Sequence, residues 1–191
     1  RRTIPEFVSR YPKIQITVSE GTHEDLAYGL KNRNVDFLAI GLSSFQNSSG
    51  LQKELITNVP LSVIVRKGHP LQSQTKLSLS QLAPYSLMAP TSVGQTHPLS
   101  IAVTDADPGL LTPTIICGDF PTLISTLMCS DSLLISAAYN CEFELRQGVL
   151  VELDVTHPTL NTELGIIEVD KRSRSPAAQK FIDILKKKLT R

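Results

Sequence analysis

The chain has 191 residues, of which 19 are Lys or Arg and 18 are Asp or Glu, so its formal charge is +1. This length suits one domain or two small lobes, and it suffices to bury a hydrophobic core. A near-neutral chain is not expected to grip nucleic acid itself, because binding phosphates requires a concentrated basic surface. No apolar run reaches the roughly 18–20 residues that span a bilayer.

The N-terminus and the cysteines indicate where the protein works. The first residues do not form a basic-then-apolar signal segment, and the chain begins with Arg1, so we expect a fragment of a longer protein. Three scattered cysteines are too few for a disulfide scaffold. We therefore expect a reducing, cytoplasmic location.

The first part of the chain alternates helix and strand patterns. Residues 2–10 show helical spacing and end before Tyr11-Pro12, where proline stops a helix. Ile14–Val18 alternates apolar and polar residues, which is typical of a half-buried strand. Thr22 then precedes a helix with Asp25 in its first turn, as an N-cap should. Val35–Leu42 is a continuous apolar run that predicts a strand parallel to the earlier one, with a right-handed crossover.

The same alternation continues to the C-terminus. A break at residues 67–76 suggests a lobe boundary, and a final helix opens at Ser175-Pro176. Asp119 and Pro121 mark the start of another helix. These patterns predict an α/β fold, expected as two lobes. The remaining predicted strands are Leu51–Thr57, Leu61–Arg66, Tyr85–Ala89, Thr114–Cys117, Leu133–Ile135, Val149–Leu153 and Glu163–Val169, and the remaining predicted helices are Leu99–Ala106, Phe120–Cys129 and Ala137–Arg146.

Six local strings, in order along nearly the whole chain, resemble one family. The sequence is similar to the effector-binding (co-inducer) domain of LysR-type transcriptional regulators. The strings are Ile4–Phe7 through Tyr11-Pro12, Ile14–Thr22, Leu26 through Asn34–Ile40, Val65 through His69-Pro70-Leu71, Leu79 through Leu82, and Ser175–Ala178 with Phe181-Ile182.

The resemblance implies a fold like type-2 periplasmic binding proteins, with two Rossmann-like α/β lobes joined by two crossover segments. Lobe I would comprise residues 1–66 and 165–191, and lobe II residues 67–164, with crossovers near Arg66–Pro70 and Glu163–Gly165. Family members also carry a winged helix-turn-helix domain, a linker helix and a first strand, all absent from this chain. Ser130-Asp131-Ser132 stands where the family commonly has Gly-x-Gly.

Strand ends and helix N-termini in such folds favour small polar or anionic ligands. Three places fit: Gly21-Thr22, Gly41–Ser44 and the loop Pro90–His97. The alternatives are plain N-capping for Thr22, an ordinary polar turn for Gly41–Ser44, and a solvent loop with one cap for Pro90–His97. The predicted ligand-binding residues are Gly21, Thr22, Leu42, Ser43, Thr91, Ser92, Gln95, Thr96, His97 and Asp119.

The resemblance also implies assembly. Members form head-to-tail dimers, or tetramers, in which lobe I of one copy meets lobe II of another. The residues predicted at that interface are Ile4, Phe7, Val8, Ile16, Val18, Thr122, Ser125 and Thr126.

Other chemistries find little support in the sequence. The four His are isolated, no His-x3-His or Cys-x2-Cys pair is present, and Gly-x-Ser-x-Gly is absent, so we expect no metal site, no cofactor and no catalytic residues. Cys117 and Cys129 are interpreted as small buried hydrophobes in preference to redox sensors. The basic residues around Lys171, Arg172 and Lys186–Lys188 are interpreted as a solvated face.

The hypothesis is therefore a ligand-sensing domain that binds a small polar metabolite, expected to be anionic, between its lobes. Ligand binding would control transcription through the missing DNA-binding domain. The alternative is a solute-binding protein of a transport system, which shares the fold. Upstream sequence would separate the two, because a helix-turn-helix favours the regulator and a signal segment favours transport.

Overall fold

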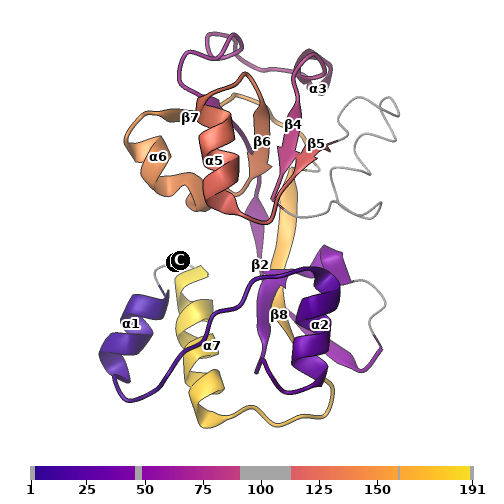
Figure 1. Cartoon of the computed structure of the whole chain (residues 1–191), viewed down its shortest axis with the longest axis vertical. Coiled ribbons are helices and arrows are strands. Elements are labelled where there is room, and N and C mark those ends of the chain that lie inside the picture. The colour runs from indigo at the N-terminus through magenta and orange to yellow at the C-terminus, as the bar shows by residue number, and fades with distance from the viewer. Residues whose placement is uncertain (1–2, 46–48, 91–112, 159, 190–191) are drawn as a thin grey trace. The chain divides into compact units, whose positions relative to one another are not determined.

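The computed structural model describes residues 3–45, 49–90, 113–158 and 160–189 (Figure 1). The chain divides into two compact units, the first formed by residues 1–58 and 163–191 and the second by residues 59–162. It passes from one unit to the other after Asn58 and returns after Thr162. The predicted lobes placed Ser62–Arg66 in the first lobe and a crossover at Arg66–Pro70. Here that strand pairs only with strands of the second unit.

The first unit contains a three-stranded sheet in the order β1-β8-β2. β1 is antiparallel to the central strand β8, and Leu38 lies opposite Ile167 while Gly41 lies opposite Leu164. Its elements are α1 (Thr3–Arg10), α2 (His23–Lys31), β1 (Leu38–Gly41), the 3-10 helix η1 (Leu42–Phe45), β2 (Leu51–Pro60), β8 (Asn161–Val169) and α7 (Pro176–Leu189).

Apolar side chains on both faces of this sheet explain why it folds. Leu30, Leu38 and Ile167 form one buried cluster under α2. On the other side, α1 packs against α7 (Figure 1), with the rings of Phe7 and Phe181 5.2 Å apart. Thr22 caps α2 through a capping box with Asp25, so the predicted N-cap is confirmed.

The strand predicted at Ile14–Val18 is wrong for this structure, as is its parallel pairing with the next strand. Residues 15–20 carry no strand, and β1 pairs antiparallel with β8. Ile14 and Ile16 are half-buried whereas Val18 is 66% exposed. An alternating pattern indicates only that every second side chain is buried. A strand also needs a neighbouring strand to pair with its backbone N–H and C=O groups, and no described segment pairs with residues 15–20.

The second unit is built on a five-stranded sheet in the order β5-β4-β6-β3-β7. β4 is parallel to both β5 and β6, whereas β3 is antiparallel to β6 and β7. Its elements are β3 (Ser62–Arg66), α3 (Leu79–Leu82), β4 (Leu87–Ala89), β5 (Pro113–Ile116), α5 (Phe120–Met128), β6 (Leu133–Ser136), the 3-10 helix η2 (Ala138–Cys141), α6 (Glu142–Arg146) and β7 (Leu150–Glu152).

The central strands of this sheet are covered on both faces. Val63 and Val65 of β3 face one buried cluster, whereas Ile64 faces another together with Leu123 and Leu127 of α5. This two-sided burial explains why β3 and β6 appear in the sequence as continuous apolar runs.

Most predicted elements have a counterpart, with two differences of detail. The helix predicted at Ala137–Arg146 is divided into η2 and α6. β2 continues to Pro60, so the gap between the strands predicted at Leu51–Thr57 and Leu61–Arg66 shrinks to the single residue Leu61. The helix predicted at Leu99–Ala106 lies outside the described residues.

Candidate functional site

The parallel strands of the second unit end together at one edge of its sheet. β4, β5 and β6 run in the same direction, so Ala89, Ile116 and Ser136 lie at their shared carboxyl edge. From β4 the chain goes outward to β5, whereas after β6 it goes to β7 at the opposite end of the sheet. The pair β4/β6 is thus a topological switch point, and open α/β sheets bind ligands in the crevice outside such a point.

Two polar side chains stand at this switch point. Ser136 is the last residue of β6 and is 3% exposed, and its Oγ accepts a hydrogen bond from Asn140 Nδ2 at 3.1 Å. Because the Ser136 hydroxyl is the acceptor in this hydrogen bond, its own O–H can be donated to another acceptor. The sequence analysis missed both residues, although the rule that ligands meet strand ends, applied to the run Leu133–Ser136, would have found Ser136.

Asp119 lies beside the same edge, just after β5, but its carboxylate is occupied. One oxygen accepts from Thr122 N at 2.9 Å and from Thr122 Oγ1 at 2.5 Å. These hydrogen bonds lower the pKa of the Asp119 carboxyl below its ordinary value, and the bond from the Thr122 hydroxyl has the larger effect. The predicted cap of α5 is confirmed, and the position carries a negative charge.

In the first unit, the predicted residues after β1 lie near the crossing at residue 162, because Gly41 faces Leu164. The Leu42 side chain is buried in the hydrophobic cluster of this unit, so only its backbone is available to a ligand. Thr22 is exposed, and its hydroxyl donates to Asp25 Oδ2 at 2.7 Å while accepting from Asp25 N at 3.2 Å. Gly21 precedes it and is also exposed.

Five other predicted contacts have no described position. Thr91, Ser92, Gln95, Thr96 and His97 fall within residues 91–112, outside the described part of the chain. Ser43 belongs to η1. The described residues therefore place Asp119 after β5 and the newly identified Ser136 and Asn140 at the end of β6, along the same edge of the second unit.

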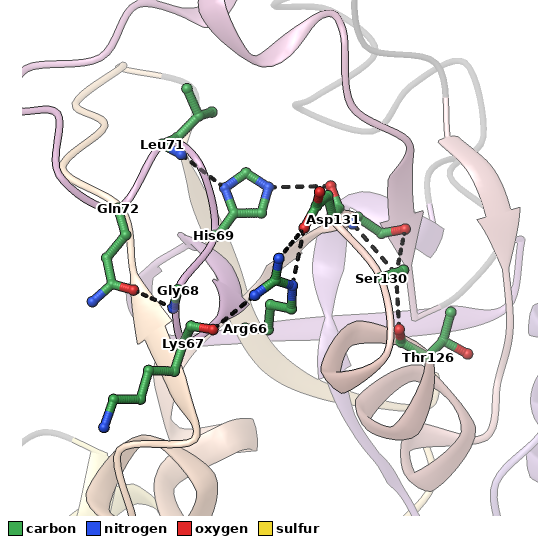
Figure 2. Close-up of polar contacts among 10 residues, drawn as sticks. Arg66, Lys67, Gly68, His69, Leu71, Gln72, Thr126, Ser130 and Asp131 are labelled. Carbon is green, nitrogen blue, oxygen red and sulfur yellow. Dashed lines mark hydrogen bonds and ion pairs between the residues drawn. The ribbon is translucent and has the colours of Figure 1, made fainter.

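A separate polar cluster at the opposite edge of this sheet corrects the prediction about Arg66. β3 begins at Ser62, opposite Ser136, and ends at Arg66, opposite Leu150; Arg66 is therefore remote from the switch point. Its Nε and Nη2 donate to Asp131 Oδ1 at 2.9 and 2.6 Å, as Figure 2 shows. This arginine is committed to a carboxylate and is not positioned at the crossover.

His69 holds the same loop from the other side (Figure 2). It is 3% exposed. Its Nδ1 accepts from Leu71 N at 3.1 Å, so its Nε2 carries the proton and donates to the Asp131 carbonyl, also at 3.1 Å. Neither Ser130, Asp131 nor Ser132 has positive φ. The turn thus does not require the glycines that the family commonly has, and the polar side chains hold it instead.

Neither the cysteines nor the residue types that commonly bind metals add a further site among the described residues. Cys129 is exposed, contrary to prediction, because it caps the C-terminus of α5 at the surface; Cys117 is half-buried and Cys141 is buried. Among the residues that the structure describes, no group of three or more His, Cys, Asp or Glu could hold a metal. In the same residues, none of the helices has the length and apolarity needed to cross a bilayer.

Residues 1–190 match the family model of the LysR substrate binding domain. The chain therefore belongs to this family and is the effector-binding domain of a LysR-type protein, as the sequence predicted. The α/β, periplasmic-binding-protein-like fold is confirmed with it.

Three relatives illustrate the similarity. The HTH-type transcriptional regulator GalR of Pseudomonas putida is 25% identical over 189 residues, which are 98% of this chain and 47% of GalR. The regulatory domain of Synechocystis CcmR, solved with 2-PG, has a TM-score of 0.79 at 17% identity, over 97% of this chain and 88% of that one. The effector-binding domain of QuiR, solved with shikimate, has a TM-score of 0.74 at 17% identity, over 98% of this chain and 88% of that one. The chain spans about half the length of its curated relative.

Proposed function

We propose that this domain binds a small polar metabolite, anionic in character, and controls transcription through a winged helix-turn-helix domain of the same cytoplasmic protein. The observation that carries the proposal is the β4/β6 switch point, where the buried Ser136 hydroxyl and the Asn140 amide meet, in a chain of an effector-binding family. The complexes of CcmR with 2-PG and QuiR with shikimate support a small ligand.

The expected contacts come from both units. In the second unit they are Ser136 and the segment after β4 that contains Thr91; in the first they are Thr22 and the backbone at Leu42-Ser43. Ser136 and the threonines can each donate a hydroxyl proton to an oxyanion. The Asp119 carboxylate, with its lowered pKa, would repel an anion placed against it and thereby restrict where the ligand's charge lies.

Regulation requires that the ligand bind one conformation more tightly than another. A ligand with equal affinity for two lobe arrangements shifts nothing, however tightly it binds. The transport alternative shares the fold, but the family match favours the regulator.

A thermal-shift screen of carboxylates, amino acids, sugars and sulfate-like anions tests the proposal. A ligand at 100 times its Kd should raise the midpoint by about 5–10 °C for a chain of this size. We expect Ser136→Ala, Thr22→Val and Thr91→Val each to reduce that shift relative to the variant's own unliganded midpoint.

Two matched variants control for local damage. Thr22→Ser keeps both the hydroxyl and the cap of α2, and Ser80→Ala removes an exposed hydroxyl elsewhere in the second unit; both should retain the full shift. If the best ligand stabilised all three site variants as much as the unmodified chain, the site assignment would be wrong.

A further inference from the structure

The first unit has a hollow of about 430 Å³ between the turn after α2 and the turn after β8. Lys31 and Arg33 line it from the first turn, and Asp170, Lys171, Arg172 and Ser173 from the second. A smaller hollow of about 280 Å³ adjoins it and shares Arg172 and Ser173. The pair of hollows offers room for a small molecule, not for a single ion only.

The charge lining the larger hollow is strongly positive. Four cationic side chains face one carboxylate, that of Asp170, in a chain whose net charge is only +1. None of the four forms an ion pair with a described residue, whereas Arg174, in the adjoining hollow, is paired with Glu168 and Glu54. The Nη1 atom of Arg172 is buried without a hydrogen-bond partner, so this guanidinium can turn toward an anion without losing a bond there.

Two of these cations occupy backbone positions that favour glycine. Arg33 has φ 63° and Lys171 has φ 58°, in the left-handed region where a side chain is unfavourable. Arg33 closes α2 in a Schellman motif, in which Asn34 N donates to Gly29 O at 2.9 Å and glycine or asparagine is usual. A helix C-terminus accounts for Lys31, since it attracts cations. This attraction does not explain why an arginine and a lysine that both have positive φ, Arg33 and Lys171, line the same hollow.

The hollow is remote from the residues expected to contact the effector. It lies where β1 begins and β8 ends, beyond the pair Leu38/Ile167, whereas the effector residues follow the pair Gly41/Leu164. Val169, which lines the hollow, is five residues along β8 from Leu164, or about 17 Å at strand spacing. One ligand of metabolite size therefore does not fill both sites.

We infer that this hollow binds a small multivalent oxyanion, such as a phosphate- or pyrophosphate-bearing metabolite. Lys31, Arg33, Lys171 and Arg172 supply the positive charge, and the Ser173 hydroxyl supplies a further donor. The phosphate of a free metabolite and the phosphate of a DNA backbone share this chemistry. The small volume of the hollow, about 430 Å³, favours the small ligand, because a DNA duplex is too wide to enter it.

Calorimetric titration with inorganic pyrophosphate at low ionic strength tests the inference. In the double variant Arg33→Gly/Lys171→Gly, the affinity should fall by about tenfold or more, while the thermal midpoint stays the same or rises because glycine relieves both left-handed residues. Lys76→Gly is the matched control: Lys76 is also a lysine with positive φ, 52°, but lies in the second unit, so its loss should leave the affinity unchanged.

Four results would overturn the inference. They are no binding of pyrophosphate at millimolar concentration, equal affinity in the double variant, an equal loss in Lys76→Gly, and loss of binding in Ser136→Ala, which would place pyrophosphate at the effector site. A parallel titration with a short DNA duplex distinguishes the source of the phosphate. If the double variant weakened DNA binding but not pyrophosphate binding, the nucleic acid backbone would be the ligand.

Discussion

At Gly165 the central strand of the first unit passes so close to its neighbours that a side chain does not fit. A Cβ added there would lie 2.4 Å from the Glu54 carbonyl oxygen and 2.7 Å from both δ-methyl carbons of Leu42. The first contact is with backbone, which cannot rotate away. The close approach of β8 and β2 therefore depends on the missing side chain at this one position.

We predict that Gly165→Ala lowers the free energy of unfolding by about 1–3 kcal/mol, the usual cost of overpacking a tight interior. Urea unfolding followed by circular dichroism measures it. Gly118→Ala is the control, because a Cβ at Gly118 meets no atom within 4 Å. Equal stability of the two variants would show that β2 and β8 separate more easily than the structure implies.

At the scale of elements, an ion-pair network joins β2, β8 and α7. Arg174 donates from Nε to both oxygens of Glu168 at 2.8 Å and from Nη2 to Glu54 at 2.7 Å. Lys186, in the last turn of α7, also pairs with Glu54. Glu168 is buried, so its charge is tolerated only because Arg174 neutralises it.

This network makes the first unit sensitive to acid. The hydrogen bond from Lys186, and then that from Arg174, lowers the pKa of the Glu54 carboxyl from its ordinary value of 4.5. A carboxyl with a lowered folded-state pKa contributes stability above its unfolded-state pKa. That contribution disappears as the pH falls through the folded-state pKa. We therefore expect urea midpoints to decline below about pH 4.5.

In Lys186→Met the Glu54 pKa should return toward its ordinary value, so the decline of the urea midpoint between pH 5 and pH 3 should be shallower. The control is Lys187→Met, which removes the same charge from the exposed neighbour of Lys186. A decline as steep in Lys186→Met as in the unmodified chain would mean that the Lys186–Glu54 pair contributes nothing measurable.

At the scale of the whole molecule, the head-to-tail dimer remains a proposal. Of the residues predicted at its interface, Phe7 is buried within its own unit against Phe181, and the Thr126 hydroxyl bonds the Thr122 carbonyl at 2.8 Å. Ile4 and Ile16 are half-buried, whereas Val8, Val18, Thr122 and Ser125 are exposed. A partner copy would therefore contact these four exposed side chains.

We predict that Val18→Lys reduces dimerisation, because it would place a charge in an apolar contact. Light scattering coupled to size-exclusion chromatography measures the mass across a concentration series. Val149→Lys is the matched control, an exposed valine of the second unit outside the predicted interface. A strict monomer of the unmodified chain at high concentration, or equal masses for both variants, would contradict the proposal.

Local patterns were sufficient to predict most helices, most strands and the family. The Thr22 and Asp119 caps and the apolar stripe of α7 depend on neighbours only three or four residues away, and such information is contained in a short window of sequence. The run Val35–Leu42 correctly predicted a strand, which the structure narrows to Leu38–Gly41, but of this strand's residues only Leu38 is buried, so the expected burial on both faces is wrong.

Pairing and position were decided only by the folded chain. Ile14–Val18 has the pattern of a strand but no partner, β1 pairs antiparallel with β8 instead of parallel to that segment, and the direction of β3 carries Arg66 away from the switch point to Asp131. Arg33 and Lys171 line one hollow for the same reason. Each juxtaposition depends on strand order and register between segments remote in sequence, and no local pattern encodes which segments will meet.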